Sequence, residues 1–202
     1  MVLGLACLSV VWAKAAEPKL SGPEWVKQFP GSRKMEDLND EFRPKFQLFQ
    51  AALKEAGATT RINSTLRPPE RAYLMHWCWR IARQDFDPRE VPAREGVDIR
   101  WWHGDAATSK QKALEMVNAY GMKNLQVRPA LNSRHTEGKA VDMDVTWKDT
   151  LKIERHDGTT VEISSAPRDS TNPDLIEVAK GYGVIHFINV PKDAVHWSTD
   201  GR

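Results

Sequence analysis

The sequence predicts an α+β fold, in which an antiparallel β-sheet is flanked by helices. Two observations lead to this prediction. Apolar residues recur at helical spacing in the first half of the chain, and alternating, hairpin-linked segments follow in the second half. Helices and strands segregated in this way are typical of α+β proteins. Because the chain has no internal repeat or low-complexity segment, we expect one domain over residues 16–202.

The first half contains two predicted helices joined by a strand. The first helix ends at Gly57, and its apolar positions follow helical spacing. These positions are Phe42, Phe46, Phe49 and Leu53. β-Branched residues predict a strand over 59–64, and Pro68-Pro69 then begins the second helix. The expected buried face of that helix comprises Leu74, Trp77, Cys78 and Ile81.

Residues 85–107 interrupt this regularity, because they contain prolines, glycines and tryptophans without any period. An irregular stretch of this length inside a compact domain is usually functional or mobile. We therefore expect it to form a wall of a substrate groove. Ser109 is expected to cap a third helix that ends at Gly121.

The second half begins with a segment, 139–147, in which apolar and polar side chains alternate. This is the pattern of a strand with one buried face. A hairpin over 151–164, a helix over 172–182 and two short strands over 183–188 and 195–198 complete the predicted elements. The residues on the apolar face of the first strand are Val141, Met143, Val145 and Trp147.

The composition is that of an ordinary globular protein, with 41% hydrophobic and 28% charged residues among 202. Lys and Arg number 29 against 27 Asp and Glu, and no basic stripe is present, so a nucleic-acid partner is not expected. Two cysteines, Cys7 and Cys78, are too few for a disulfide scaffold. The eight tryptophans indicate either packing or a groove for an extended or sugar-bearing ligand.

The N-terminus resembles an export signal. Residues 1–12 are apolar but too few to span a bilayer, and Ala13-Lys14-Ala15 fits a signal-peptidase site. We therefore expect residues 1–15 to be a signal peptide and the mature domain to be periplasmic or secreted, without a membrane span and as a monomer. The alternative is an N-terminal helix packed on the domain, and no Lys or Arg precedes the apolar run.

Three side chains are suited to binding a divalent metal. Asp142 lies on the polar face of the strand over 139–147, where burial would require a cation, hydrogen bonds or a metal. His135 lies just upstream, and Gly138 lets the chain turn back toward that strand. With His196, these residues give two histidines and one aspartate, and a fourth position left for water is typical of a catalytic zinc.

Asp193 lies three residues before His196, close enough to act as general base on that water without binding the metal. A non-functional interpretation treats the three ligands as a surface histidine, a capped aspartate and a core histidine. Asp144 shares the face of Asp142, where it either supports a ligand or is solvated. His76 has no pattern that distinguishes it from a surface residue.

The segment from Ser133 to Asp142 reads Ser-x-His-x-x-Gly-x-Ala-x-Asp, and Asp193-x-x-His196-Trp197 follows near the end. Together with Ser64-Thr65-Leu66-Arg67 after the strand over 59–64, these motifs resemble the zinc D-alanyl-D-alanine carboxypeptidase family. That family also includes dipeptidases of vancomycin resistance and phage L-alanyl-D-glutamate endopeptidases. The resemblance extends from about residue 61 to residue 197.

The resemblance implies a fold like that of Hedgehog domains and D-alanyl-D-alanine peptidases. It implies that His135, Asp142 and His196 bind Zn²⁺ and that Asp193 activates the water. Arg67 would stabilise the oxyanion or bind a substrate carboxylate, and Ser133 would hydrogen-bond the ligand loop or the substrate.

The implied activity is hydrolysis of an amide bond in the stem peptide of peptidoglycan, as a D-alanyl-D-alanine carboxypeptidase. An L-alanyl-D-glutamate endopeptidase, active in wall remodelling, phage lysis or as a toxin, is the alternative. A zinc-bearing binding module without turnover, like the Hedgehog signalling domain, is a third interpretation. The acid at Asp193 and the guanidinium at Arg67 argue against it, because a binding module needs neither.

Overall fold

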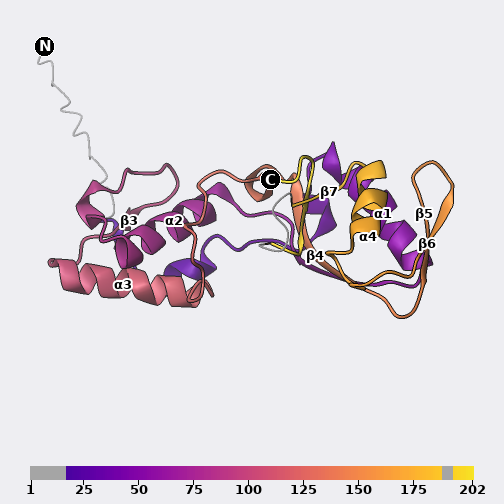
Figure 1. Ribbon diagram of the computed structural model, residues 1–202. Coiled ribbons are helices and arrows are strands. Elements are labelled where there is room, and N and C mark those ends of the chain that lie inside the picture. Colours follow the sequence, from indigo (N-terminus) through magenta and orange to yellow (C-terminus); the bar gives the residue numbers. More distant parts are fainter. Residues whose placement is uncertain (1–16, 188–192) are drawn as a thin grey trace, which may run out of the picture.

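The structure is a computed structural model that describes residues 17–187 and 193–202. The expected signal peptide, residues 1–15, lies outside the described residues. The described chain has two halves, each with its own hydrophobic core, and Figure 1 shows them at opposite ends of the molecule. We call them the sheet half, which contains β2, β4 to β8, α1 and α4, and the helical half, which contains β1, β3, α2 and α3.

The sheet half is built on a four-stranded antiparallel sheet with the order β2-β4-β8-β7. The strands are β2 (Thr59–Ser64), β4 (Ala140–Thr146), β7 (Ile185–His186) and β8 (His196–Ser198). A hairpin of β5 (Leu151–Glu154) and β6 (Thr160–Ile163) packs against helix α1 (Phe42–Glu55), on the far side from the four-stranded sheet (Figure 1). The mixed content and the antiparallel sheet confirm the predicted α+β class.

Two helices cover the apolar face of the sheet, α1 (Phe42–Glu55) and α4 (Pro173–Gly181). The predicted alternation in β4 is confirmed, because Val141, Met143 and Val145 are fully buried whereas Asp142 and Asp144 stay partly exposed. The four apolar positions predicted for the first helix are also fully buried in α1. The spacing of apolar residues in the sequence therefore predicts correctly which face of α1 and of β4 packs into the core.

The helical half packs α2 (Pro69–Arg83) against α3 (Ala106–Ala119), with a short 3₁₀ helix, η1 (Pro23–Lys27), against α3. The first strand, β1 (Lys19–Leu20), pairs in parallel with β3 (Ile99–Arg100). Six of the eight tryptophans are buried in the two cores, which favours packing over a tryptophan-lined groove. They are Trp25, Trp77, Trp79, Trp101, Trp147 and Trp197.

The third helix begins earlier than the sequence predicted. Asp105, not Ser109, is the N-cap of α3, since its carboxylate accepts a hydrogen bond from the Thr108 N–H at 2.8 Å. Ser109 lies inside the first turn, where its hydroxyl donates to the Asp105 carbonyl at 2.7 Å. The predicted end is confirmed, because Gly121 has a φ of 73° and follows the C-cap.

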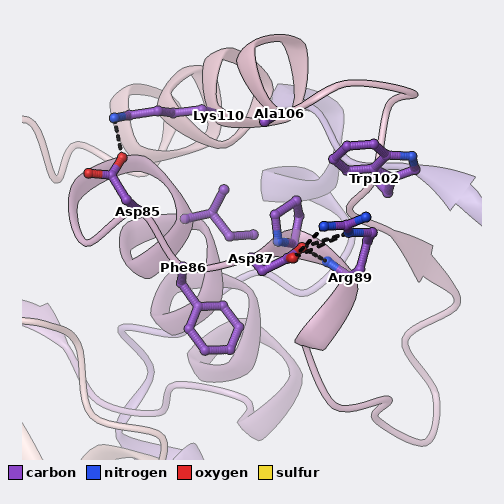
Figure 2. A pocket seen from close by; sticks show the side chains of 9 residues that line it. Asp85, Phe86, Asp87, Arg89, Trp102, Ala106 and Lys110 are labelled. Carbon is purple, nitrogen blue, oxygen red and sulfur yellow. Dashed lines mark hydrogen bonds and ion pairs between the residues drawn. The ribbon is translucent and has the colours of Figure 1, made fainter.

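Residues 85–107 belong to the helical half. Asp85 to Arg89 and Trp102 line a pocket with a volume of about 250 Å³, together with Ala106 and Lys110 of α3. Figure 2 shows the pocket from close by. The charged groups of this pocket are paired with each other, Asp87 with Arg89 at 2.7 Å and Asp85 with Lys110. The pocket beside Asp142 is lined by residues from 31–33 and 63–75 instead. Residues 85–107 do not contribute to the lining of the pocket beside Asp142, and their role as a groove wall stays a prediction.

None of the helices in the described ranges is both long and apolar enough to cross a membrane.

Candidate metal centre

Three elements bring the predicted metal ligands together. Asp142 on β4 and His196 on β8 are directly opposed in the antiparallel pair, so their side chains share one face of the sheet. His135 is buried on a short 3₁₀ turn, η4 (Arg134–Glu137), that precedes β4.

Gly138 ends the η4 turn with a φ of 66°, a left-handed conformation that suits glycine. A Cβ atom there would lie 3.0 Å from the Asn39 main-chain nitrogen and 3.1 Å from the Asp37 carbonyl oxygen. Glycine thus permits both the turn and the close approach of residues 37–39. The chain reverses at this point and directs His135 toward Asp142, as the sequence predicted.

The ligand atoms form a nearly equilateral triangle. His135 Nε2 lies 3.1 Å from Asp142 Oδ1 and 3.2 Å from His196 Nδ1, and His196 Nδ1 lies 3.3 Å from Asp142 Oδ1. Ligand atoms about 2.0–2.1 Å from a tetrahedral zinc are separated from one another by roughly 3.3 Å. The triangle therefore has the size of one face of such a tetrahedron, and a fourth position remains above it.

The other ring nitrogen of each histidine faces a main-chain oxygen. His135 Nδ1 is 3.0 Å from the Thr65 oxygen, and His196 Nε2 is 2.9 Å from the Arg202 oxygen. An oxygen of this kind can only accept, so these nitrogens carry the protons. The two nitrogens in the triangle are then acceptors that face a carboxylate, and three converging acceptors require a cation. The buried group can hold a metal ion.

Electrostatics keeps a negative charge in the triangle. Burial disfavours the charged form of Asp142. When protons occupy the triangle in place of a metal ion, both histidine rings donate to Asp142, and these hydrogen bonds and charges outweigh burial and hold the pKa of Asp142 well below its ordinary value. Burial lowers the pKa of His196, but its hydrogen bond to Asp142 and the charge of that carboxylate raise the pKa by more. The centre therefore attracts positive charge, whether a proton or a metal ion.

Asp193 and Arg67 lie around this centre. The main-chain oxygen of Asp193 accepts from the main-chain N–H of His196 at 3.3 Å, and partial burial and the charge of Asp142 raise the pKa of the Asp193 carboxylate. The Arg67 N–H donates to the His135 carbonyl at 3.1 Å. Burial lowers the pKa of Arg67 against the opposing charges of Asp142 and Asp193. The structure thus brings both predicted residues to the metal ligands.

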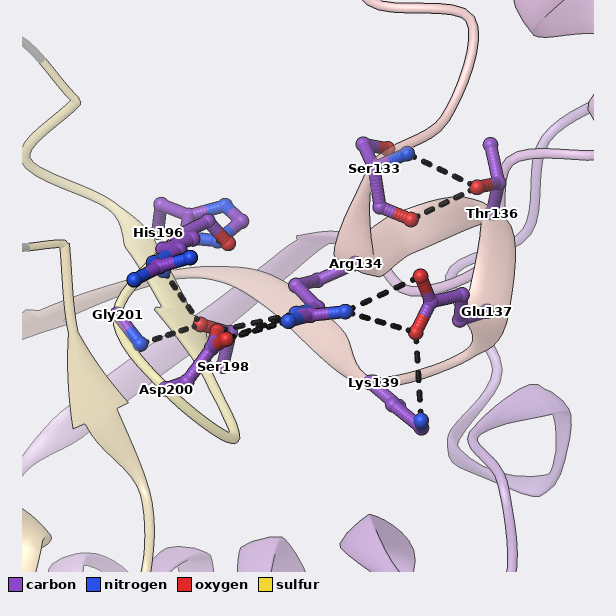
Figure 3. A network of polar contacts seen from close by, with 10 residues as sticks. Ser133, Arg134, Thr136, Glu137, Lys139, His196, Ser198, Asp200 and Gly201 are labelled. Carbon is purple, nitrogen blue, oxygen red and sulfur yellow. Dashed lines mark hydrogen bonds and ion pairs between the residues drawn. The ribbon is translucent and has the colours of Figure 1, made fainter.

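Ser133 is the N-cap residue of η4, and its main chain makes the contacts that shape the turn. Its N–H donates to Thr136 Oγ1 at 3.0 Å, and its carbonyl accepts from the Thr136 hydroxyl at 2.7 Å (Figure 3). The Ser133 hydroxyl is buried and has no hydrogen-bond partner within 17–187 and 193–202. Ser133 thus supports the ligand loop through its backbone, and its hydroxyl remains available.

An ion-pair network missed by the sequence analysis ties the η4 turn to residues 199–202. Arg134 donates from Nε to both carboxylate oxygens of Asp200, at 3.0 and 3.1 Å, and from Nη1 to Glu137 at 3.0 Å (Figure 3). Ser198 Oγ accepts from the main-chain N–H of Gly201 and of Arg202, at 2.9 and 3.2 Å. The network therefore connects the turn that carries His135 to the segment whose oxygen holds His196.

Asp144, which shares the strand face of Asp142, does not support the metal ligands. Its carboxylate accepts from Arg61 at 2.7 Å and from the Asn63 amide at 2.9 Å. His76 is buried and not on the surface as the sequence suggested, because its Nδ1 lies 2.8 Å from the Pro129 carbonyl.

A search of protein-family models, curated proteins and solved structures returned no match to this chain.

Proposed function

We propose that the protein is a zinc peptidase that hydrolyses an amide bond in the stem peptide of peptidoglycan, as a D-alanyl-D-alanine carboxypeptidase. The observation that carries this proposal is the triangle of acceptors from His135, Asp142 and His196, with protonated nitrogens directed away from it. The sequence motifs that contain these residues add the substrate class. We further propose a fold like that of Hedgehog domains and D-alanyl-D-alanine peptidases, and a monomer acting in the periplasm or outside the cell.

The donor set fits zinc, because two imidazoles and one carboxylate leave a tetrahedral position open. A zinc ion in this triangle would polarise the scissile carbonyl and lower the pKa of a water in that position. The second hydrogen bond of each histidine fixes its ring orientation and tautomer.

Asp193 and Arg67 supply the remaining chemistry. Asp193 accepts the proton of the attacking water and returns it to the leaving amine, and its raised pKa suits a group that must both take and release a proton. Arg67 donates hydrogen bonds to the carbonyl oxygen as negative charge develops on it. Its main-chain bond to His135 holds it close to the metal ligands.

Digestion of purified peptidoglycan by the zinc-loaded protein, with mass spectrometry of the products, tests the proposal. We expect stem peptides shortened by one alanine. Cleavage between L-alanine and D-glutamate would instead identify the endopeptidase. Asp193→Asn should keep the metal and lose about a hundred- to ten-thousand-fold in turnover, the usual cost of removing a general base. Intact stem peptides after treatment with a protein that carries stoichiometric zinc would overturn the proposal.

A further inference from the structure

Three guanidinium groups share the pocket beside Asp142. This pocket has a volume of about 270 Å³, and its lining includes Arg33, Arg67 and Arg71 but no carboxylate other than Asp142. Asp142 already faces both histidine ligands. The pocket therefore has an excess of positive charge next to the metal centre.

Arg33 reaches the pocket through main-chain pairing between distant segments. The Ser32 N–H donates to the Leu66 carbonyl at 2.8 Å, and the Thr65 N–H donates to the Ser32 carbonyl at 2.8 Å. The carbonyl of Thr65 in turn accepts from His135 Nδ1. The backbone of Arg33 is thus fixed relative to the metal ligands, although Arg33 lies well outside the segment that carries the sequence motifs.

The three arginines differ in how they are engaged. Arg71 donates from Nη1 to the carbonyls of Val26 and Phe29, at 3.1 and 3.3 Å, and stacks on Tyr120 at 4.8 Å from the ring centre. Arg33 and Arg67 also line the pocket, and among the described residues no side-chain hydrogen bond or ion pair engages either guanidinium. Arg67 is half-buried, whereas Arg33 is exposed.

We propose that Arg33 binds a free carboxylate of the substrate, on the residue that provides the leaving amine. This inference rests on the proposed function and deepens it. Both activities considered above release such a residue: a terminal D-alanine has a free carboxylate, and so does D-glutamate that is linked through its side chain. Arg33 therefore selects amide bonds next to a negative charge, while the more buried Arg67 stabilises the oxyanion. A charge-assisted, two-point contact is what a guanidinium provides.

Steady-state kinetics on a matched peptide pair tests this role. One peptide ends in D-alanyl-D-alanine and the other in its carboxamide; if the protein cuts at glutamate, the pair is L-alanyl-D-glutamate and its α-amide. For the acid, Arg33→Ala should raise KM about tenfold with kcat within twofold, as expected for loss of uniform binding through one charged contact. For the amide, Arg33→Ala should change neither parameter.

Two variants serve as controls. Arg33→Lys should recover part of the lost affinity, because it keeps the charge without the planar donor. Lys34→Ala removes a neighbouring charge that does not line the pocket and should leave both peptides unaffected. An equal effect of Arg33→Ala on acid and amide, or no effect on either, would overturn the inference.

Calorimetric binding of both peptides to zinc-loaded Asp193→Asn protein separates this inference from the proposed function. Absence of turnover by the wild-type protein would contradict the peptidase activity alone. The carboxylate subsite would still be supported if the acid bound about tenfold more tightly than the amide and Arg33→Ala abolished that difference. Equal affinities for acid and amide would refute it.

Discussion

The two halves of the molecule bury histidine in different ways. In the helical half, His76 Nδ1 bonds the Pro129 carbonyl, and the ring packs edge-on against Trp77 with 4.8 Å between centroids. Burial lowers the pKa of His76, so this ring stays neutral inside an aromatic core. In the sheet half, His135 and His196 also bond a main-chain oxygen, but their second nitrogens converge with each other and with Asp142.

This difference shows what distinguishes a metal ligand from a core histidine. Burial and a bond to a main-chain oxygen are common to His76 and His135. The distinguishing feature is that the second ring nitrogens of His135 and His196 converge with the Asp142 carboxylate, and a cation must balance such a buried group of acceptors. We therefore expect metal binding and its consequences to be confined to the sheet half, while the helical half contributes stability.

The largest expected effect comes from removing a ligand. His135→Ala or His196→Ala should abolish stoichiometric zinc binding, because the two remaining ligand atoms do not form a closed triangle. His76→Ala, the matched control in the helical half, should retain full zinc and lose only stability. Metal analysis of the purified variants by mass spectrometry measures this. Stoichiometric zinc in both ligand variants would contradict the assigned centre.

Metal removal should affect the two halves unequally. When free zinc exceeds its dissociation constant a hundredfold, binding adds about 2.7 kcal/mol to stability. Chelation should therefore lower the melting temperature and increase hydrogen exchange at the amides of β4 and β8, where the acceptors then repel each other. The amides of α2 and α3 should exchange as before. If chelation increased amide hydrogen exchange equally in both halves, the two halves would not respond to the metal independently.

A smaller effect is expected from the network that ties η4 to residues 199–202. Asp200→Asn should weaken zinc binding about ten- to a hundredfold, the usual cost of losing an outer contact of a metal site. Asp200→Glu should retain part of the zinc affinity that Asp200→Asn loses, because it keeps the carboxylate. The control is Glu162→Gln, which breaks an exposed ion pair of 2.8 Å with Lys152 on the β5–β6 hairpin. Competition with a chromogenic chelator gives the affinities, and equal values for Asp200→Asn and Glu162→Gln would exclude a positioning role.

The smallest effect is expected in the helical half. Asp105→Ala removes the N-cap of α3 and should lower the free energy of unfolding by about 1 kcal/mol. Zinc affinity should not change, because α3 packs mainly against α2 and η1, away from the sheet that carries Asp142 and His196. Urea denaturation of the zinc-loaded protein, followed by a zinc titration, checks both statements. A change in zinc affinity would show that the halves are coupled.

Local pattern explains what the sequence could predict. The strand over 59–64 and the apolar face of β4 follow from alternation within a few residues, and the structure has them at those positions. The three metal ligands were predicted from their spacing in the sequence and from Gly138, which lets the chain turn back toward Asp142. The start of α3 was misplaced because Asp105 and Ser109 are both good capping residues, and only the hydrogen bond to Thr108 distinguishes them.

Contacts between distant segments explain what the sequence could not predict. Arg33 enters the site only because Ser32 pairs with Thr65 and Leu66. Arg134 and Asp200 are 66 residues apart and meet only when β8 pairs with β4. The buried His76 ring bonds the carbonyl of Pro129, which lies 53 residues further along the chain. No short-range period encodes such contacts, so they appear only in the folded chain.

The buried thiol of Cys78 has a consequence for the redox conditions that the fold tolerates. Cys78 is fully buried on α2 and forms no disulfide, and burial raises the pKa of its thiol far above the ordinary value. A protonated, enclosed thiol neither attacks oxidants nor exchanges with other disulfides. Within residues 17–187 and 193–202, folding therefore requires no disulfide, and the thiol of Cys78 is protected in both reducing and oxidising surroundings.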